Sequence, residues 1–105
     1  MPWIYLVVAG ILEVVWAFAM KQSDGFSRPV PTLITVTAMA VSLWLLALAM
    51  RSIPLGTAYT IWTGIGAMGA FVVGIVFLGE PLNAARILAA LLIVSGLVLM
   101  RIASA

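Results

Sequence analysis

The 105-residue sequence contains no cysteine and no histidine, and it has only three acidic side chains. Without cysteine there are no disulfides, thiolate nucleophiles or cysteine metal sites. Without histidine the commonest general base and transition-metal ligand is missing. The three carboxylic acids are Glu13, Asp24 and Glu80. We therefore expect a protein that is not an enzyme and that binds neither a metal nor a cofactor.

Charge of either sign is scarce. Charged residues make up 8% of the chain and hydrophobic residues 66%, whereas an ordinary globular domain carries roughly 25% charged residues. These few charges cannot cover the surface of a water-soluble fold. We therefore expect the chain to be surrounded by lipid. The five basic residues are scattered, which argues against a nucleic-acid-binding patch.

Four long apolar runs account for most of the chain, and charges, glycines and prolines separate them. About 20 residues of helix span a hydrocarbon core roughly 30 Å thick, and lipid offers an unpaired backbone no other hydrogen-bond partner. The sequence therefore predicts an all-α membrane protein whose residues 1–105 form a single transmembrane domain. Its four helices are expected at about residues 3–20, 32–50, 57–79 and 85–103.

The basic residues are almost equally divided between the two ends of such a bundle. The end with both termini and the second loop holds Arg51 and Arg101, and the opposite end holds Lys21, Arg28 and Arg86. An excess of positive charge normally sets the orientation of a membrane protein. A difference of one charge is compatible with insertion in both orientations and pairing with an inverted copy, and equally with one weakly preferred orientation.

The third run contains Gly64-Ile-Gly-Ala-Met-Gly69, which matches the dinucleotide-binding pattern G-x-G-x-x-G. That pattern carries its meaning only between a strand and a helix, with an acidic residue about 20 positions later. Here the glycines lie inside an apolar run. Small residues allow transmembrane helices to approach closely, so we interpret the motif as a packing or bending element.

Glu13 is the most informative residue because it lies near the middle of the first run. A charge at that depth costs at least about 2.5 kcal/mol, and an intramembrane acid without a basic partner is by default a proton site, a cation site or both. No basic residue lies at a comparable depth in any run. The alternative is a protonated glutamate that hydrogen-bonds to a neighbouring helix.

Helical spacing indicates what surrounds this acid. Residues three or four apart share a helix face, which places Gly10 and Trp16 beside Glu13. Ser42 lies near mid-depth in the second run. One face of the third run carries Tyr59, Trp62, Gly66 and Gly69. The serine hydroxyl has the alternative of bonding to its own helix, and the aromatic residues of forming an interfacial belt.

A carboxylate, a hydroxyl and aromatic faces together suit a small cation. Indole rings attract cations through their π-faces. A planar guanidinium fits especially well, because two of its N–H groups can meet one carboxylate in parallel.

Three stretches of the chain carry a family resemblance. These are AGILEVVWA at 9–17, KQSDGFSR at 21–28 and IPLGTAYTIWTGIGAMGA at 53–70. The chain resembles the small multidrug resistance family over essentially its whole length. Glu13 followed by Trp16 matches the guanidinium-exporter branch, since the branch that exports polyaromatic cations carries glycine in place of Trp16. Thr60 and Met20 depart from the usual alanine and leucine, and Thr60 leaves small changes in substrate selection open.

The resemblance implies a proton-coupled antiporter that exports guanidinium and small substituted guanidinium ions. It also implies an antiparallel (dual-topology) homodimer that spans the bacterial inner membrane several times. Glu13 would bind substrate and proton in turn, with Gly10 leaving room beside the acid. The other lining residues would be Trp16, Ser42, Tyr59 and Trp62. The glycine-rich third helix would bend, and the fourth, around Ser95 and Gly96, would form the dimer interface.

Three alternatives remain at this point. The first is an exporter of bulky quaternary ammonium compounds. The second is a transporter subunit that needs a different partner chain. The third is a small membrane scaffold without transport, in which Glu13 only packs helices.

Overall fold

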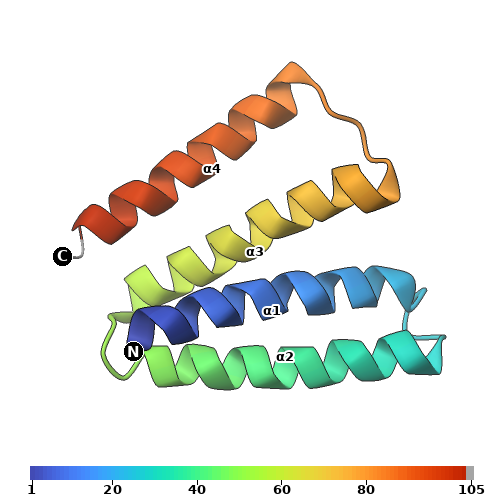
Figure 1. The fold of residues 1–105 in the computed structure, drawn as a ribbon, viewed down its shortest axis with the longest axis horizontal. Helices are drawn as coiled ribbons and strands as arrows, with labels where there is room; N and C mark the ends of the chain where they lie inside the picture. Colours follow the sequence, from blue (N-terminus) through green and yellow to red (C-terminus); the bar gives the residue numbers. More distant parts are fainter. Residues whose placement is uncertain (104–105) are drawn as a thin grey trace.

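The computed structural model describes residues 1–103, and these form four helices joined by short loops (Figure 1). The helices are α1 (Pro2–Gln22), α2 (Pro29–Ala49), α3 (Leu55–Leu78) and α4 (Ala84–Ala103). Each is long and apolar enough to cross a membrane. The predicted all-α architecture with four spans is thus confirmed, and the chain is a multi-pass membrane protein.

Prolines mark where the first three helices begin. Pro2 and Pro29 lie in the first turns of α1 and α2, and Pro54 directly precedes α3. Proline is tolerated in a first turn because its missing N–H has no partner there in any case. Helix α2 therefore begins at Pro29, and not near residue 32 as the sequence suggested.

The four helices stand in one row, in the order α2, α1, α3, α4 (Figure 1). The molecule measures 42 × 35 × 16 Å, and a helix with its side chains is about 10–12 Å across. The fold is therefore a flat layer, although α2 also touches α3 beside α1. Helix α1 packs between α2 and α3, whereas α4 lies along α3 at the edge of the row.

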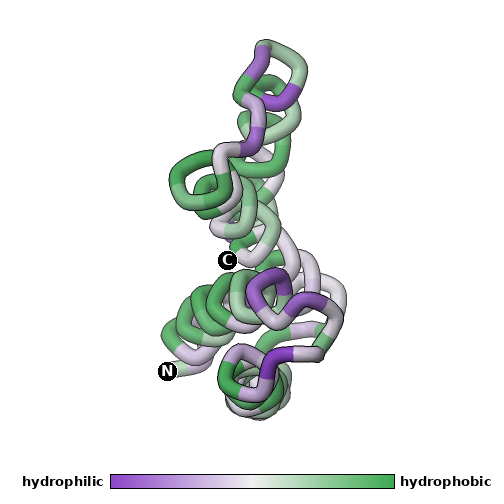
Figure 2. The backbone as a smooth tube through the Cα atoms, turned by 90° about the vertical axis from the view of Figure 1, so that its right-hand side faces the viewer, coloured by the Kyte–Doolittle hydropathy of each residue, from purple (hydrophilic) through white to green (hydrophobic). Residues whose placement is uncertain are grey.

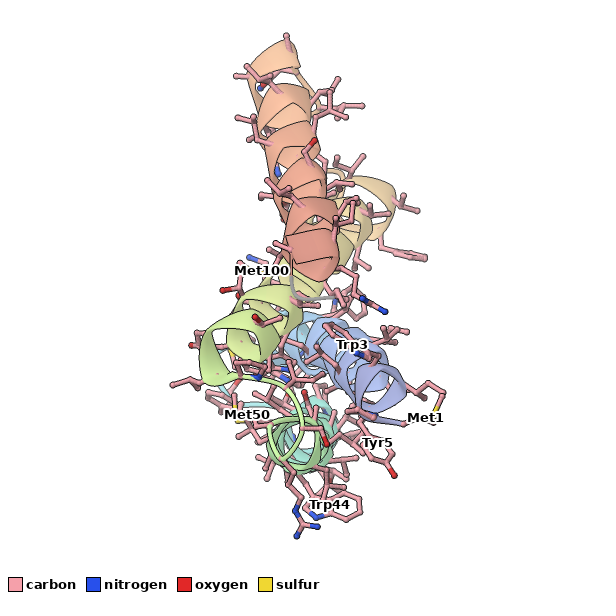
Figure 3. The ribbon with its side chains drawn as sticks, turned by 90° about the vertical axis from the view of Figure 1, so that its left-hand side faces the viewer. Met1, Trp3, Tyr5, Trp44, Met50 and Met100 are labelled. Atoms are coloured by element: carbon pink, nitrogen blue, oxygen red, sulfur yellow. The ribbon has the colours of Figure 1, made fainter. Side chains whose placement is uncertain are left out.

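Hydrophilic residues gather in the loops at the end of the layer that faces the viewer in Figure 2, and the helices behind them are mostly apolar. The loops that follow α1 and α3 lie at one end, with Asp24 in the first and Glu80 in the second. Met1, Met50 and Met100 mark the opposite end (Figure 3). Trp44 points away from the neighbouring helices in the same view, and 62% of it is exposed.

The buried core lies where α1, α2 and α3 meet. Its members are Leu6, Ala9, Leu46, Ala49, Ile53, Ala58, Ile61 and Trp62. Alanines at such positions let membrane helices approach closely. By contrast, α4 contributes no buried residue. The three-helix core is what fixes the candidate site described below.

Helix α3 runs without interruption through the glycine motif. A Cβ atom at Gly64 would overlap Leu97 of α4, and one at Gly69 would overlap Val14 of α1. The glycines therefore admit side chains from helices on both sides of α3. The packing interpretation of the motif is confirmed.

Candidate cation-binding site

Ser42 joins three helices through two buried hydrogen bonds. Its hydroxyl donates to the backbone carbonyl of Ala9 at 2.7 Å and accepts the indole N–H of Trp62 at 3.1 Å. The serine is fully buried. Since its hydroxyl bonds to α1 and α3, the alternative that Ser42 bonds only to its own helix is excluded. Thr35 does show that pattern, donating to Pro31 of α2 at 2.8 Å.

This network holds the Trp62 ring in a fixed position. Hydrogen bonds between membrane helices contribute about 0.6 kcal/mol on average and up to about 1.7. An unpaired buried donor costs more, about 1–3 kcal/mol. Removing the serine hydroxyl would leave the Trp62 N–H without its acceptor. Ser42 is thus as important for orienting Trp62 as for packing.

Tyr59 extends this aromatic surface outward. Its ring centroid lies 5.6 Å from that of Trp62, and the two planes are inclined by 44°. Trp62 is 6% exposed and Tyr59 is 51% exposed. One ring is therefore anchored in the core, and the ring one helical turn before it lies at the surface. Together they present π-faces of the kind that attract cations.

Glu13 lies near the middle of α1 and is half-buried. Its Oε1 atom is buried and has no hydrogen-bond partner among the described residues. The ion pair within residues 1–103 joins Arg86 to Glu80 and leaves Glu13 out. The carboxyl group lies against Gly66 of α3, because a Cβ at that glycine would overlap Oε1, Cδ and Cγ of the acid.

Trp16 follows Glu13 by three residues and so shares its face of α1. Its indole Nε1 is also buried and without an acceptor among the described residues. An unpaired acceptor and an unpaired donor thus lie close together within the span. Buried polar groups are normally hydrogen-bonded, so this pair of exceptions marks a place where a ligand would find partners.

Comparison with known proteins establishes the family of this chain. The family profile described as Small Multidrug Resistance protein matches residues 1–93. The chain belongs to the small multidrug resistance family. The guanidinium exporter of Yersinia pseudotuberculosis is 56% identical over 104 residues, 99% of this chain and 100% of the relative. Those of Escherichia coli O6:H1 and Salmonella typhimurium are 60% and 55% identical over 98 residues, 93% of each chain.

In this small multidrug resistance protein, hydrogen bonds and ring contacts bring together Ser42, Trp62 and Tyr59. Glu13 is brought against Gly66. The two hydrogen bonds of the Ser42 hydroxyl go to Ala9 and Trp62, and Oε1 of Glu13 has no partner among the described residues. Within residues 1–103 no three metal-binding side chains gather, so Glu13 is not part of a metal-binding cluster there.

The structure corrects the role expected for Gly10. This glycine is buried, but a Cβ there would lie 2.6 Å from Cγ2 of Ile65, an atom of α3. Gly10 therefore makes room for Ile65, and the glycine that makes room for the acid is Gly66. The reason is that α1 turns the Glu13 side chain toward α3, where only a residue without a side chain leaves enough space.

Sequence reasoning missed one participant of the site and one contact. Helical spacing placed Gly66 on the α3 stripe of Tyr59 and Trp62, but it did not show that Gly66 lies against the Glu13 carboxyl group. The carbonyl of Ala9 offered no signal, because every residue carries the same backbone group. Only the packing of α2 against α1 shows which carbonyl Ser42 reaches.

Proposed function

We propose that this chain is a proton-coupled antiporter that exports guanidinium and small substituted guanidinium cations. The observation that carries the proposal is the Glu13 carboxyl group, which lies within a membrane span with Oε1 buried and unpaired. Relatives that are 55–60% identical over 93% or more of the chain are named guanidinium exporters, which supports the same substrate here.

The chemistry of the surrounding groups matches such a substrate. A charged carboxylate in a membrane needs a neutralising partner, and a guanidinium ion supplies both charge and a fork of N–H donors. Ser42, Trp16, Tyr59 and Trp62 line or order the site around the acid. The two tryptophans and the tyrosine contribute π-faces that favour a flat cation.

Exchange follows if the proton and the cation use the same carboxylate. Each neutralises Glu13, so binding of one weakens binding of the other, and the coupling is reciprocal. A proton entering from one side then displaces a cation toward the other. An inward proton gradient is sufficient to drive export, and no further energy source or cofactor is needed.

We further propose that the working unit is an antiparallel homodimer in the bacterial inner membrane, each chain being one four-helix transmembrane domain. Helix α4 has no buried residue, and a Cβ at Gly96 would meet nothing within 4 Å. The surface around Ser95 and Gly96 is thus open to a closely packed helix of a second copy. The glycine-rich α3 would bend as the site changes its accessibility.

The test is transport by the purified protein in liposomes, recorded as guanidinium-evoked, pH-dependent currents. We expect currents from the wild type and none from Glu13→Gln, which removes the charge and keeps the shape. Asp24→Asn is the matched control, because this exposed loop acid has a φ of 50° that asparagine also adopts. It should transport like the wild type.

Three results would contradict the proposal. Retained pH-driven guanidinium transport by Glu13→Gln would remove the acid from the mechanism. Silence toward guanidinium, with currents evoked by a bulky quaternary ammonium ion, would make the protein an exporter of larger drugs. Absence of flux with any cation would leave two interpretations: a subunit that needs a different partner chain, and a scaffold in which neutralising Glu13 weakens assembly only.

A further inference from the structure

An apolar trough lies between α4 and the pair formed by α1 and α3. It consists of two cavities of about 380 and 550 Å³. They share Ile65 and Leu97 and therefore lie next to each other along the layer. None of the residues that line the trough is among the six residues predicted for the cation site.

The length of the trough matches one leaflet of a bilayer. Along α1 its lining runs from Trp3 to Val15, a stretch of about 18 Å at 1.5 Å per residue. The hydrocarbon core of a bilayer is roughly 30 Å thick, so one leaflet is about 15 Å. On α1 and α4 the trough begins near a helix end, at Trp3 and Ile102, and it extends to about the middle of each helix, as an acyl chain does from the membrane surface.

A single charged side chain lines the trough, and it lies at the surface end. This is Arg101, in the last turn of α4. Its guanidinium carbon lies 4.4 Å from the ring centroid of Trp3, which lines the trough from α1. The ring holds the arginine at the mouth of the groove. A guanidinium has five N–H donors, so contact with one ring leaves donors for a phosphate.

The charges at this end favour an anionic headgroup over a zwitterionic one. Besides Arg101, the other charged side chain at this end is Arg51, in the loop between α2 and α3. All three acidic side chains lie elsewhere: Glu13 within its span, and Asp24 and Glu80 in the loops of the opposite end. No acidic side chain is available there for the ammonium of a choline or ethanolamine headgroup.

We propose that the trough binds one anionic phospholipid, with its phosphate on Arg101 and an acyl chain along α3. Arg101 lies at the surface end of the trough and the apolar lining lies deeper, which matches a lipid whose phosphate lies at the membrane surface and whose acyl chain lies deeper. A lipid in this position also covers part of α4, the one helix that has no buried residue of its own. The proposal does not depend on Glu13 or on what the protein transports.

Native mass spectrometry of the purified protein, with phosphatidylglycerol or phosphatidylcholine added, tests this site. We expect phosphatidylglycerol to be retained preferentially, and Arg101→Gln to weaken its retention by about tenfold, as for loss of one charged hydrogen-bonding partner. Arg51→Gln is the matched control, because it removes the same charge from the same end without touching the trough. It should leave the preference unchanged.

A second pair of variants tests the groove without altering charge. Val98 lines the trough and Leu91 does not, although both lie on α4 and are more than half exposed. Neither substitution disturbs a buried position. Val98→Trp should reduce retention of phosphatidylglycerol, and Leu91→Trp should not. The Val98 and Leu91 variants therefore still test the trough if Arg101→Gln fails to fold.

Several outcomes would overturn the proposal. Equal losses for the two arginine variants would mean that the whole basic end attracts headgroups without a defined site. No preference between the two lipids, or no effect of Val98→Trp, would exclude the trough. Because the chain has no cysteine, Val98→Cys gives a clean cross-linking probe. Rapid disulfide formation between copies there would show that a second chain, and not a lipid, fills the groove.

Discussion

Gly66 of α3 lies directly against the carboxyl group of Glu13 on α1, so the acid rests on the backbone of the neighbouring helix. The missing side chain at one position thus determines where the charged group of another is placed. Any substitution at Gly66 should therefore change the position of the Glu13 carboxyl group, although the glycine itself carries no polar side chain.

Gly66→Ala should therefore impair transport strongly. The added Cβ would overlap three atoms of the Glu13 side chain, which must rotate away or push α1 from α3. A displacement near 1 Å is able to reduce a position-dependent step by up to about a hundredfold, and we expect at least a tenfold lower guanidinium flux. The measurement is flux in liposomes at a matched amount of inserted protein.

The control for that variant lies on the same helix. Gly56 also belongs to α3, but a Cβ there would meet nothing within 4 Å. Gly56→Ala should keep its transport. Similar losses for both alanines would show that α3 needs glycine for backbone freedom, and that contact with Glu13 is not the reason.

Ser42→Ala should destabilise the three-helix core by about 1–2 kcal/mol, since Trp62 then loses its buried acceptor. The free energy of unfolding can be measured by titration with a denaturing detergent, followed by tryptophan fluorescence. Thr35→Val is the comparison, because Thr35 is equally buried but bonds only to its own helix. It should cost less than Ser42→Ala. Equal losses of unfolding free energy would show that hydrogen bonds between helices stabilise the core no more than a bond within one helix.

The ion pair at the start of α4 should contribute little to stability. Nη2 of Arg86 lies 3.4 Å from Oε1 of Glu80, and both side chains are partly exposed. Exposed pairs contribute about 0–1 kcal/mol. A double-mutant cycle with Glu80→Gln and Arg86→Gln should give a coupling energy in that range that declines with added salt. A coupling well above 2 kcal/mol would show that lipid shields the pair.

Gly79→Ala should shorten or loosen the end of α3. Gly79 has a φ of 67°, a conformation that costs other residues about 1–2 kcal/mol. Behind it, the N–H of Glu80 donates to the carbonyl of Gly74 at 3.0 Å and closes the helix. Hydrogen exchange of α3 should increase locally in this variant. Gly96→Ala, in the open interior of α4, should leave α3 unchanged.

Hydropathy alone was sufficient to predict four spans, because lipid permits few other backbone structures. The start of α2 was placed too late, since the prolines at positions 29 and 31 were taken as breakers although a first turn tolerates them. The sequence also could not give the order of the helices in the row. That order depends on which alanines and glycines face each other, and a single chain's apolar pattern does not specify this.

The candidate site was predictable residue by residue but not in its contacts. Glu13 was identified by its depth alone, and Ser42, Tyr59 and Trp62 by helical spacing. Their connections were not predictable, because Ser42 bonds to a backbone carbonyl of Ala9. The family resemblance implied that Gly10 makes room for the acid, and a sequence cannot test such a role because it does not show contacts between helices.

The edge position of α4 determines how tolerance to mutation is distributed in this protein. Ala9, Ala49 and Ala58 are fully buried, so even one added methyl group there competes with the chain's own packing. Helix α4 has no such position. Apart from Leu97 and Met100, which pack against the core, folding of the single chain therefore imposes few size limits on its side chains. In a complete mutational scan, apolar substitutions elsewhere in α4 that reduce fitness would report on molecules outside the chain, and so would map its surroundings.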